Sequence, residues 1–216
     1  MILNGRTFYA QVIIINFWLL FSCSMVLGTA TDIFCLKSIK GSLADPYGYL
    51  KSTWDFSNIT EGFICRFTGV ECWNSVESRV MNLNLSNMGL KGQFPRAIQN
   101  CSRLTGLDLS KNTLSGKIPA DIDVLPYLVT VDLSSNNFSG RIPKSVANCR
   151  YLNSLKLDHN QLSGRIPGEL SFLRRLKIFT VTNNLLRGPV PNLPQVPATS
   201  YANNSGLCGG PLPPCS

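Results

Sequence analysis

Histidine and charged side chains are scarce in this chain. Its 216 residues include one histidine, His159, and only 15% are charged, against about a quarter in an average soluble domain. A single histidine excludes most catalytic sites built on a histidine base and most metal sites built on paired histidines. A Walker phosphate loop and a nucleophile elbow are also missing. We therefore predict that the chain is not an enzyme and that it needs neither a cofactor nor a metal ion.

Long apolar runs are absent after residue 30, where no segment approaches the roughly 18 apolar residues of a membrane helix. Residues 1–30 differ from the rest of the chain. They contain a basic residue at Arg6, a largely apolar run over residues 12–27, and small residues at Gly28 and Ala30. These are the parts of a secretory signal peptide, with a signal anchor as the alternative. We predict that the mature protein is secreted.

What the sequence does contain is a repeat with a period of 24 residues. Each of five blocks opens with Leu or Val, followed three and five residues later by an apolar pair. The openers are Val80, Leu104, Leu128, Leu152 and Leu176; asparagine recurs at Asn112, Asn136, Asn160 and Asn184; glycine recurs at Gly92, Gly116, Gly140, Gly164 and Gly188; proline recurs at Pro95, Pro119, Pro143, Pro167 and Pro191. Such a period predicts an α/β solenoid of five leucine-rich repeats.

Each residue type has a physical reason to recur. The L-x-x-L-x-L segment predicts a short strand whose leucines point inward and whose other residues face solvent, and stacked strands pair in parallel around a continuous core. An asparagine amide can satisfy the backbone groups of the turn that follows the strand. Met88 replaces this asparagine in the first block, so we expect the first turn to rely on the preceding cap or on water.

Cysteines bracket the repeats. Loss of Cys23 with the signal peptide leaves seven. Two pairs of equal spacing flank the repeats and predict disulfides that staple the caps of a secreted solenoid: Cys65–Cys72 and Cys208–Cys215. We expect Cys101 and Cys149, which align with leucines of other repeats, to be buried apolar residues too far apart for a bond with each other. Cys35 is expected to be a buried thiol, with an intermolecular link as the alternative.

The chain therefore divides into a signal peptide (1–30), an N-terminal cap (31–79), five repeats (80–193) and a C-terminal cap (194–216). Asp32 is expected to cap a helix that runs to about Leu43. The turn over residues 45–48 is expected to end that helix. Five aromatic residues of the N-terminal cap are expected to plug the open end of the core: Trp54, Phe56, Phe63, Phe67 and Trp73.

Charge and glycosylation signals decorate this framework. The formal net charge is +8, and Lys117, Arg141 and Arg165 share one repeat position. This basic ladder either attracts an acidic partner or a cell-wall polyanion, or is a solvated edge. The sequence offers four main glycosylation candidates, of which Asn84 falls mid-strand: Asn58, Asn84, Asn137 and Asn203. The sequon at Asn100, with cysteine at its centre, is weaker.

Outward-facing strand and turn residues are the candidates for binding a protein partner. Mid-strand they are Asn84, Asp108, Asp132, Lys156 and Thr180, and beside the turn they are Ser110, Lys111, Ser134, Ser135, Asp158, His159, Thr182 and Asn183. The mixture of charges suits a protein interface better than a polyanion groove, with plain solvated surface as the alternative for each residue. His159 could also report the acidity of an extracellular space, since histidine titrates near a pH of about 6.5.

Several segments resemble one plant family. Residues 107–119 match the plant-specific leucine-rich repeat, and residues 65–72 resemble the N-terminal cap of plant receptor kinases, with Phe67 where tryptophan is usual. Residues 32–36, 68–73, 125–130 and 206–212 resemble the ectodomain of BIR-type receptor pseudokinases. The resemblance implies that the concave surface binds the ectodomain of a somatic-embryogenesis-type co-receptor kinase and damps immune or hormone signalling.

The chain departs from that family after Ser216, where a membrane helix and a kinase-like domain are expected. A soluble decoy in the apoplast is the resulting hypothesis, with a plasma-membrane location if the chain is a truncated receptor. Two alternatives stay open. One is a secreted inhibitor of cell-wall-degrading enzymes, similar to polygalacturonase-inhibiting proteins, which have about twice as many repeats. The other is an inert truncated receptor.

Overall fold

The computed structural model describes residues 30–57, 62–74 and 78–215. Residues 1–29 of the predicted signal peptide and the candidate glycosylation site Asn58 lie outside the described residues. Within the described part, no helix is both long and apolar enough to cross a membrane.

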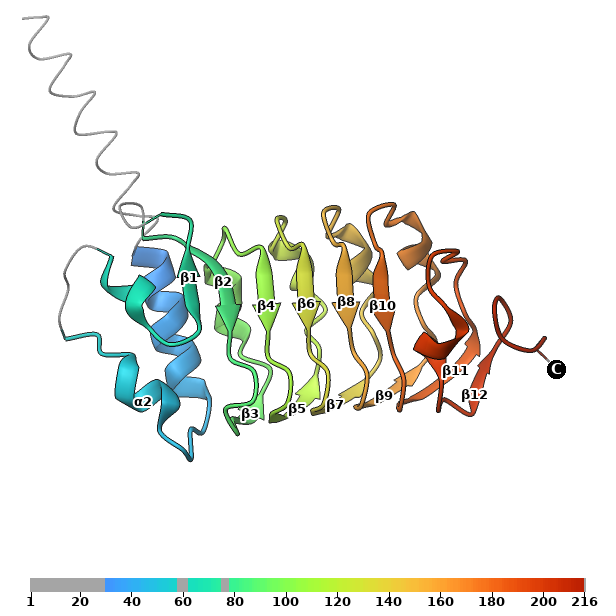
Figure 1. Ribbon diagram of the computed structural model, residues 1–216, viewed down its shortest axis with the longest axis horizontal. Helices are drawn as coiled ribbons and strands as arrows, with labels where there is room; N and C mark the ends of the chain where they lie inside the picture. The colour runs from blue at the N-terminus through green and yellow to red at the C-terminus, as the bar shows by residue number, and fades with distance from the viewer. Residues whose placement is uncertain (1–29, 58–61, 75–77, 216) are drawn as a thin grey trace, which may run out of the picture.

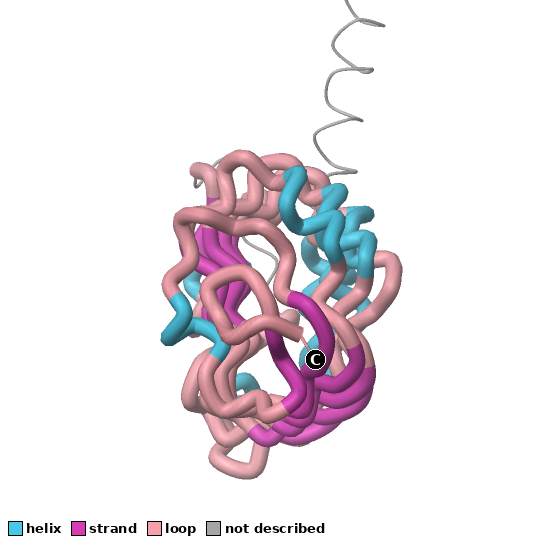
Figure 2. Tube along the Cα trace, turned by 90° about the vertical axis from the view of Figure 1, so that its right-hand side faces the viewer, coloured by secondary structure: helices cyan, strands magenta, loops and turns pink. Residues whose placement is uncertain are grey.

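The described chain winds into a solenoid with two sheets, which run along its length on different sides (Figures 1 and 2). The first sheet has the order β1 (Val70–Cys72), β2 (Val80–Asn84), β4 (Gly106–Asp108), β6 (Thr130–Asp132), β8 (Ser154–Lys156) and β10 (Ile178–Thr180). The second has the order β12 (Gly206–Cys208), β11 (Leu185–Pro189), β9 (Gln161–Gly164), β7 (Asn137–Gly140), β5 (Thr113–Lys117) and β3 (Lys91–Gln93).

The first sheet confirms the predicted parallel stacking of the repeats. Its strands pair in parallel from β2 to β10, while β1 of the cap pairs antiparallel with β2. Leu107, Val131, Leu155 and Phe179 lie in one register and are all buried. Because side chains alternate along a strand, the residues on either side of this row face outward. The second sheet was not predicted.

In the repeats, short 3₁₀ helices cover the side opposite the first sheet: η2 (Arg96–Asn100), η3 (Ile122–Val124), η4 (Lys144–Asn148) and η5 (Gly168–Phe172). The caps contain η1 (Phe63–Arg66), which lies beside β1, and η6 (Ala198–Tyr201), which lies beside β10. The recurring prolines explain three of the starts, since Pro95, Pro143 and Pro167 directly precede η2, η4 and η5. Proline lacks an N–H and has its φ fixed, so it suits a helix entrance.

A ladder of buried asparagines joins successive coils. Asn136 donates from Nδ2 to the carbonyl oxygens of Leu109 (2.9 Å), Leu133 and Ser134, and its Oδ1 accepts from the N–H of Leu114 (2.9 Å). Asn160 and Asn184 repeat this pattern. Each amide therefore serves its own turn and the preceding coil, which removes the penalty for burying those backbone groups.

The two ends of the ladder differ from expectation. At the turn that contains Met88, Asn112 of the next coil accepts at Oδ1 from the N–H groups of Met88 and Leu90. At the other end, Asn204 accepts from the N–H of Leu186 and donates to the carbonyl oxygen of Val181 (2.9 Å). The asparagine ladder thus extends one coil into the C-terminal cap, only 20 residues after Asn184.

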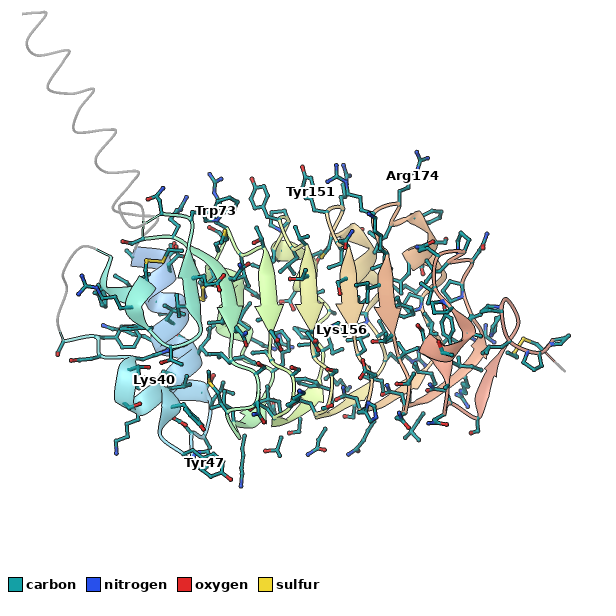
Figure 3. The ribbon with its side chains drawn as sticks, viewed as in Figure 1. Lys40, Tyr47, Trp73, Tyr151, Lys156 and Arg174 are labelled. Atoms are coloured by element: carbon teal, nitrogen blue, oxygen red, sulfur yellow. A yellow bond between two sulfur atoms is a disulfide. The ribbon has the colours of Figure 1, made fainter. Side chains whose placement is uncertain are left out.

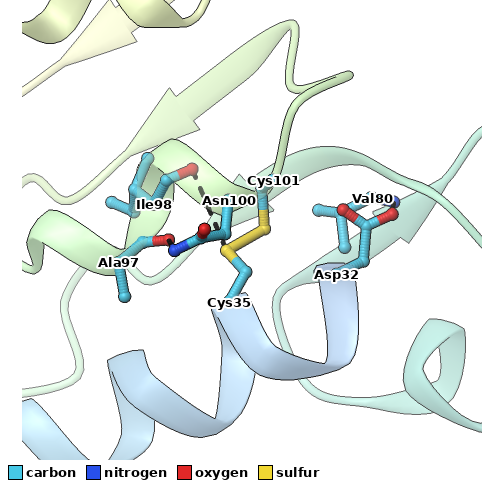
Figure 4. The surroundings of a disulfide bond; sticks show 7 residues. All are labelled: Asp32, Cys35, Val80, Ala97, Ile98, Asn100 and Cys101. Atoms are coloured by element: carbon cyan, nitrogen blue, oxygen red, sulfur yellow. Dashed lines mark hydrogen bonds between the residues drawn. A yellow bond between two sulfur atoms is a disulfide. The ribbon is translucent and has the colours of Figure 1, made fainter. Parts of the chain in front are cut away.

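Three disulfides tie the structure together. The two predicted cap bonds, Cys65–Cys72 and Cys208–Cys215, are present. The prediction of unbonded Cys35 and Cys101 was wrong: these two residues form a disulfide with a Cα–Cα distance of 5.7 Å (Figure 4). The cap helix over residues 30–42 packs beside η2, which brings together residues 66 positions apart.

Cys149 remains a buried free thiol, as predicted. It lies two coils further along the solenoid than Cys101, at a repeat position covered by neighbouring coils rather than by the cap helix. Burial raises the pKa of its thiol to about 11, so it stays protonated and unreactive.

Aromatic side chains fill the N-terminal cap, with one exception. Trp54 is fully buried, stacks on Phe67 at 5.8 Å between centroids, and donates from Nε1 to the carbonyl oxygen of Thr68 (3.0 Å). Phe56 packs edge-on against Phe67 at 5.0 Å. The inclusion of Trp73 in this plug was wrong, because its side chain is 51% exposed. Trp73 directly follows β1 and lies outside the buried aromatic cluster of the cap.

The prediction that Asp32 caps the start of the helix was wrong. Asp32 lies within the helix, since the chain is already helical at residue 30. Its side chain is buried, and Oδ2 accepts from the N–H of Val80 (3.3 Å), the residue that opens the first repeat. Burial raises the pKa of Asp32 from 3.8 to about 6, against the opposing effects of the Val80 hydrogen bond and the nearby Arg79 charge. Asp32 therefore links the cap to the first coil.

The raised pKa predicts a pH dependence of stability. Because the folded chain holds the Asp32 proton more tightly than the unfolded chain, the contribution of Asp32 is complete below a pH of about 4 and is lost as pH rises through about 6. Asp32→Asn should remove a fall on the order of 2 kcal/mol in unfolding free energy between pH 4 and 6. Urea denaturation at several pH values measures the unfolding free energy. The prediction is contradicted if this free energy varies with pH identically in the variant and the wild type.

The third disulfide predicts a specific thiol pattern. In protein that begins at residue 31, only Cys149 should react with an alkylating reagent in denaturant without reductant. Peptide mapping by mass spectrometry should recover a linked peptide pair that contains Cys35 and Cys101. Alkylation of both residues before reduction would contradict the structure.

The asparagine ladder predicts a large loss of stability from a single truncation. Asn136→Ala leaves several buried backbone groups without a partner and should lower the unfolding free energy by about 3 kcal/mol. Asn148 is a matched control, since it is exposed and bonds only to the side chain of Asp123. Asn148→Ala should change stability by less than about 0.5 kcal/mol. Equal effects of the two substitutions in urea titrations would refute the role of the ladder.

Candidate functional site

The outward residues of the first sheet form the concave face. The predicted mid-strand residues share one register across the strands: Asn84, Asp108, Asp132, Lys156 and Thr180. A second outward row, two residues earlier, was missed by sequence reasoning and consists of Asn82, Gly106, Thr130, Ser154 and Ile178. The same alternation that identified the first row predicts the second, because side chains two residues apart lie on one face.

Part of the mid-strand row serves the fold. Asp132 accepts at Oδ1 from both the N–H and the hydroxyl of Ser134, and Asp108 accepts from the N–H of Ser110 at 2.9 Å. Such side-chain bonds two residues along end the strand and start the turn. Ser110 and Ser134 are themselves buried. Their predicted role in partner binding stays a prediction, and the structure gives them a clear role in the turn.

Charges along the row neutralise one another at its centre. The ammonium group of Lys156 lies 3.2 Å from Oδ2 of Asp132, and Figure 3 shows Lys156 in the middle of the face. Asp158 accepts from the hydroxyl of Thr180 at 2.6 Å. The exposed carboxylate of Glu71 in β1 leaves the N-terminal part of the face acidic.

The predicted turn residues adopt an unusual backbone. Lys111, Ser135, His159 and Asn183 all have φ between 54° and 55°, in the left-handed region that non-glycine residues rarely enter. The asparagine ladder holds each turn in this shape from inside. As a result these four side chains form a row at the edge of the concave face where the strands of the first sheet end.

His159 is fixed by two neighbours. Its Nδ1 lies 3.1 Å from Oδ2 of Asp158, and its Nε2 lies 3.0 Å from Nδ2 of Asn183. Both contacts are satisfied together by the neutral tautomer that donates from Nδ1 and accepts at Nε2. The role of His159 as a sensor of extracellular acidity stays a prediction.

A shallow depression lies at the centre of the concave face. It has a volume of about 320 Å³ and is lined by Asn84, Asp108, Asp132 and Lys156 together with residues of the missed row. Gly106 creates part of it: a Cβ there would meet Oδ1 of Asn82 at 2.5 Å. The structure therefore brings four of the predicted residues together, and the turn residues form a separate row.

An aromatic rim borders the concave face at the edge opposite the turn row. We define it as Trp73, Arg103, Tyr127, Tyr151 and Arg175. The two tyrosine rings stack at 6.4 Å and 20°, and the guanidinium groups of Arg103 and Arg175 lie over them at 5.5 and 5.3 Å. Trp73 donates from Nε1 to the carbonyl oxygen of Arg103. Figure 3 shows Trp73 and Tyr151 projecting beyond the strands.

Sequence reasoning missed this rim, although a signal was present. Arg103, Tyr127, Tyr151 and Arg175 are separated by 24 residues each and directly precede the repeat openers. Tyr127 and Tyr151 are 42% and 45% exposed and stack on each other, and a row of tyrosine rings with apolar bodies and polar tips suits recognition. A row of stacked aromatic rings and guanidinium groups of this kind can bind a protein surface.

The other predicted sites are only partly described. Among the described residues, no cluster of three or more His, Cys, Asp or Glu side chains could hold a metal ion. Of the glycosylation candidates, Asn84, Asn137 and Asn203 are exposed. A glycan on Asn84 would stand on β2 of the concave face, whereas Asn137 begins β7 of the second sheet. Their occupancy stays a prediction.

Comparison with known proteins identifies the family. Models for a leucine-rich-repeat N-terminal domain and for leucine-rich repeats match residues 29–73, 78–138 and 151–173. The crystal structure of the BIR2 ectodomain from Arabidopsis thaliana is 48% identical with a TM-score of 0.82, over 84% of this chain and 96% of that one. This chain belongs to the BIR-type family of plant leucine-rich-repeat receptors.

A second solved structure supports this assignment. A chain in the crystal structure of the BIR3–SERK2 complex from Arabidopsis thaliana is 44% identical with a TM-score of 0.81, over 86% of this chain and 99% of that one. Among curated proteins, the inactive receptor-like kinase BIR2 from the same plant is 48% identical over 87 residues. The aligned part of the present chain covers only 14% of the length of that kinase. The match to the BIR2 ectodomain structure shows that the similarity lies in the ectodomain.

Proposed function

We propose that this BIR-type chain is an extracellular protein-binding module that docks the ectodomain of a SERK-type co-receptor kinase. The observation that carries the proposal is the match to a chain crystallised in the BIR3–SERK2 complex. The present chain is 44% identical to it and aligns with 99% of its length. The chain acts by occupying a surface of the co-receptor, not by catalysis. A co-receptor held in this way is withheld from ligand-sensing receptors, and signalling is damped.

The docking surface we propose combines the concave face with the aromatic rim. The five repeat strands span about 20 Å at a strand spacing of about 4.8 Å, which accommodates a protein interface of roughly 800 Å² per partner. Tyrosine, tryptophan and arginine are the side chains that most often dominate binding energy, and the rim consists of these three types. Its cation–π contacts hold the rings in place before binding, which reduces the entropy lost on association.

The two parts of this surface have different tasks. The rim offers apolar area in a fixed geometry, while Glu71, Asp108 and the Asp132–Lys156 pair give the concave face a charge pattern. Charge patterns select among partners and orient their approach more than they add affinity. We therefore assign apolar contact area to the tyrosine pair, and partner choice and orientation to the carboxylates, whose reversal would introduce like-charge repulsion.

Calorimetry with a purified SERK-type ectodomain at pH 5.5 tests the proposal. The wild-type chain should bind with micromolar or tighter affinity. Tyr127→Ala combined with Tyr151→Ala should weaken binding at least about tenfold, and Asp132→Lys should reverse a charge of the concave face and abolish binding. Thermal unfolding of each variant checks that the solenoid remains folded.

Phe172 provides the control. It is 77% exposed at the end of η5, away from the concave face, so Phe172→Ala removes an exposed ring without touching the proposed surface. The affinity of the Phe172→Ala variant for the SERK-type ectodomain should match that of the wild type. Absence of binding at high protein concentration would overturn the proposal and favour an inhibitor of wall-degrading enzymes. Equal losses from the tyrosine pair and from Phe172 would overturn the assignment of the surface.

A further inference from the structure

A basic groove lies between the ends of β7, β9 and β11 and the starts of η4 and η5. The groove has a volume of about 670 Å³. Its charged lining consists of four basic side chains and one acidic side chain: Arg141, Lys144, Arg165, Arg187 and Glu169. The second sheet and the aromatic rim occupy opposite edges of the concave face (Figures 1 and 3), so this groove is separate from the proposed docking surface.

The positive charges of the groove are largely unopposed. Glu169 is engaged by the ammonium group of Lys144 at 3.1 Å. No ion pair in the described part of the chain involves Arg141, Arg165 or Arg187. The register of β9 with β11, extended by one residue, places Arg187 opposite Arg165. Like charges in such positions repel one another, and a bound anion would relieve that repulsion.

The glycine column of the repeats holds the basic side chains in place. Gly140, Gly164 and Gly188 all have φ between 78° and 84°. A Cβ on Gly164 would lie 3.1 Å from Cγ of Arg141, and a Cβ on Gly188 would lie 3.3 Å from Cγ of Arg165. The apolar stems of the arginines therefore lie across the next coil. The arginines therefore follow one another along the solenoid, at one cation per coil.

We infer that this groove binds a linear polyuronate, an acidic polysaccharide with one carboxylate on each sugar ring. Neighbouring coils are about 4.8 Å apart, so the row carries about one positive charge per sugar ring of an extended chain, a linear charge density close to that of a polyuronate. Arginine offers the planar fork of donors that fits a carboxylate. An extended acidic peptide rises ~3.3 Å per residue, which matches the coil spacing less closely.

The groove is long enough for several sugar rings. A second hollow of about 550 Å³ adjoins it at Arg165 and Gly188 and continues along the C-terminal cap to the Cys208–Cys215 disulfide. In the other direction, the stem of Lys117 lies over Gly140 and adds one more cation to the row. A chain of sugar acids could therefore lie along the solenoid axis, perpendicular to the strands.

Binding of a size-defined (1→4)-linked oligogalacturonate, about ten sugars long, tests this inference. The groove variant combines Arg141→Gln, Arg165→Gln and Arg187→Gln, which keep most of each apolar stem. It should bind the oligomer at least about tenfold more weakly than the wild type. The fully methyl-esterified oligomer has the same backbone without the charge and should bind neither protein.

A charge-matched control separates the site from net charge. Arg96, Arg150 and Arg174 are exposed and lie outside the groove, so replacing all three by Gln removes the same charge. This control should stay within about threefold of wild-type affinity for the oligomer. The inference fails if both triple variants weaken equally, if polyglutamate or the methyl ester binds as tightly as oligogalacturonate, or if the wild type does not bind. Unchanged SERK-type ectodomain affinity in the groove variant separates this result from the proposed function.

Discussion

The structure depends on one interaction, the hydrogen bonding of a buried asparagine amide to the turn of its own coil and to the coil before it. The turn after each strand of the concave face exposes carbonyl and N–H groups to an apolar interior, where an unpaired group is costly. Asn136 satisfies four of them. Since the amide must reach the preceding coil, it holds the two coils at one distance and in one register. The rows of outward side chains follow from that register.

Different surfaces result from the same register. On the concave face the repeat places side chains of opposite charge side by side, as in the Asp132–Lys156 pair. At the second sheet it places arginines in a row, because a glycine of the next coil leaves room for each arginine stem. At the rim it stacks Tyr127 on Tyr151. A solenoid can therefore present separate binding surfaces on separate sides without any change in its core, since each outward position varies independently of the leucines.

The sequence predicted the features that depend on the period and missed those that depend on contacts between distant segments. The strands, the inward leucines and the two cap disulfides follow from local spacing. The Cys35–Cys101 bond does not, because the position of the cap helix beside η2 is a tertiary contact. Asp32 was assigned to a helix start for the same reason, since its partner Val80 is 48 residues away. Trp73 was counted with the other cap aromatics although it follows β1 and is exposed.

Among the candidate site residues, the outward direction of the mid-strand side chains was predictable from strand alternation. The hydrogen bonds from Asp108 and Asp132 to Ser110 and Ser134 of the turns were not predicted. Both serines are buried in these turns. The rim could have been predicted from the 24-residue spacing of Tyr127 and Tyr151. The stacking itself is a contact between side chains of neighbouring coils, and the arginines over the rings come from further coils.

The central claim is that the aromatic rim and the concave face contact the co-receptor. Hydroxyl-radical footprinting of the chain, alone and saturated with a SERK-type ectodomain, tests this directly because it reports the exposure of individual side chains. Modification of Trp73, Tyr127 and Tyr151 should fall on binding, while that of Phe172 on η5 should stay unchanged. Protection of Phe172 with unaltered modification of both tyrosines would contradict the account.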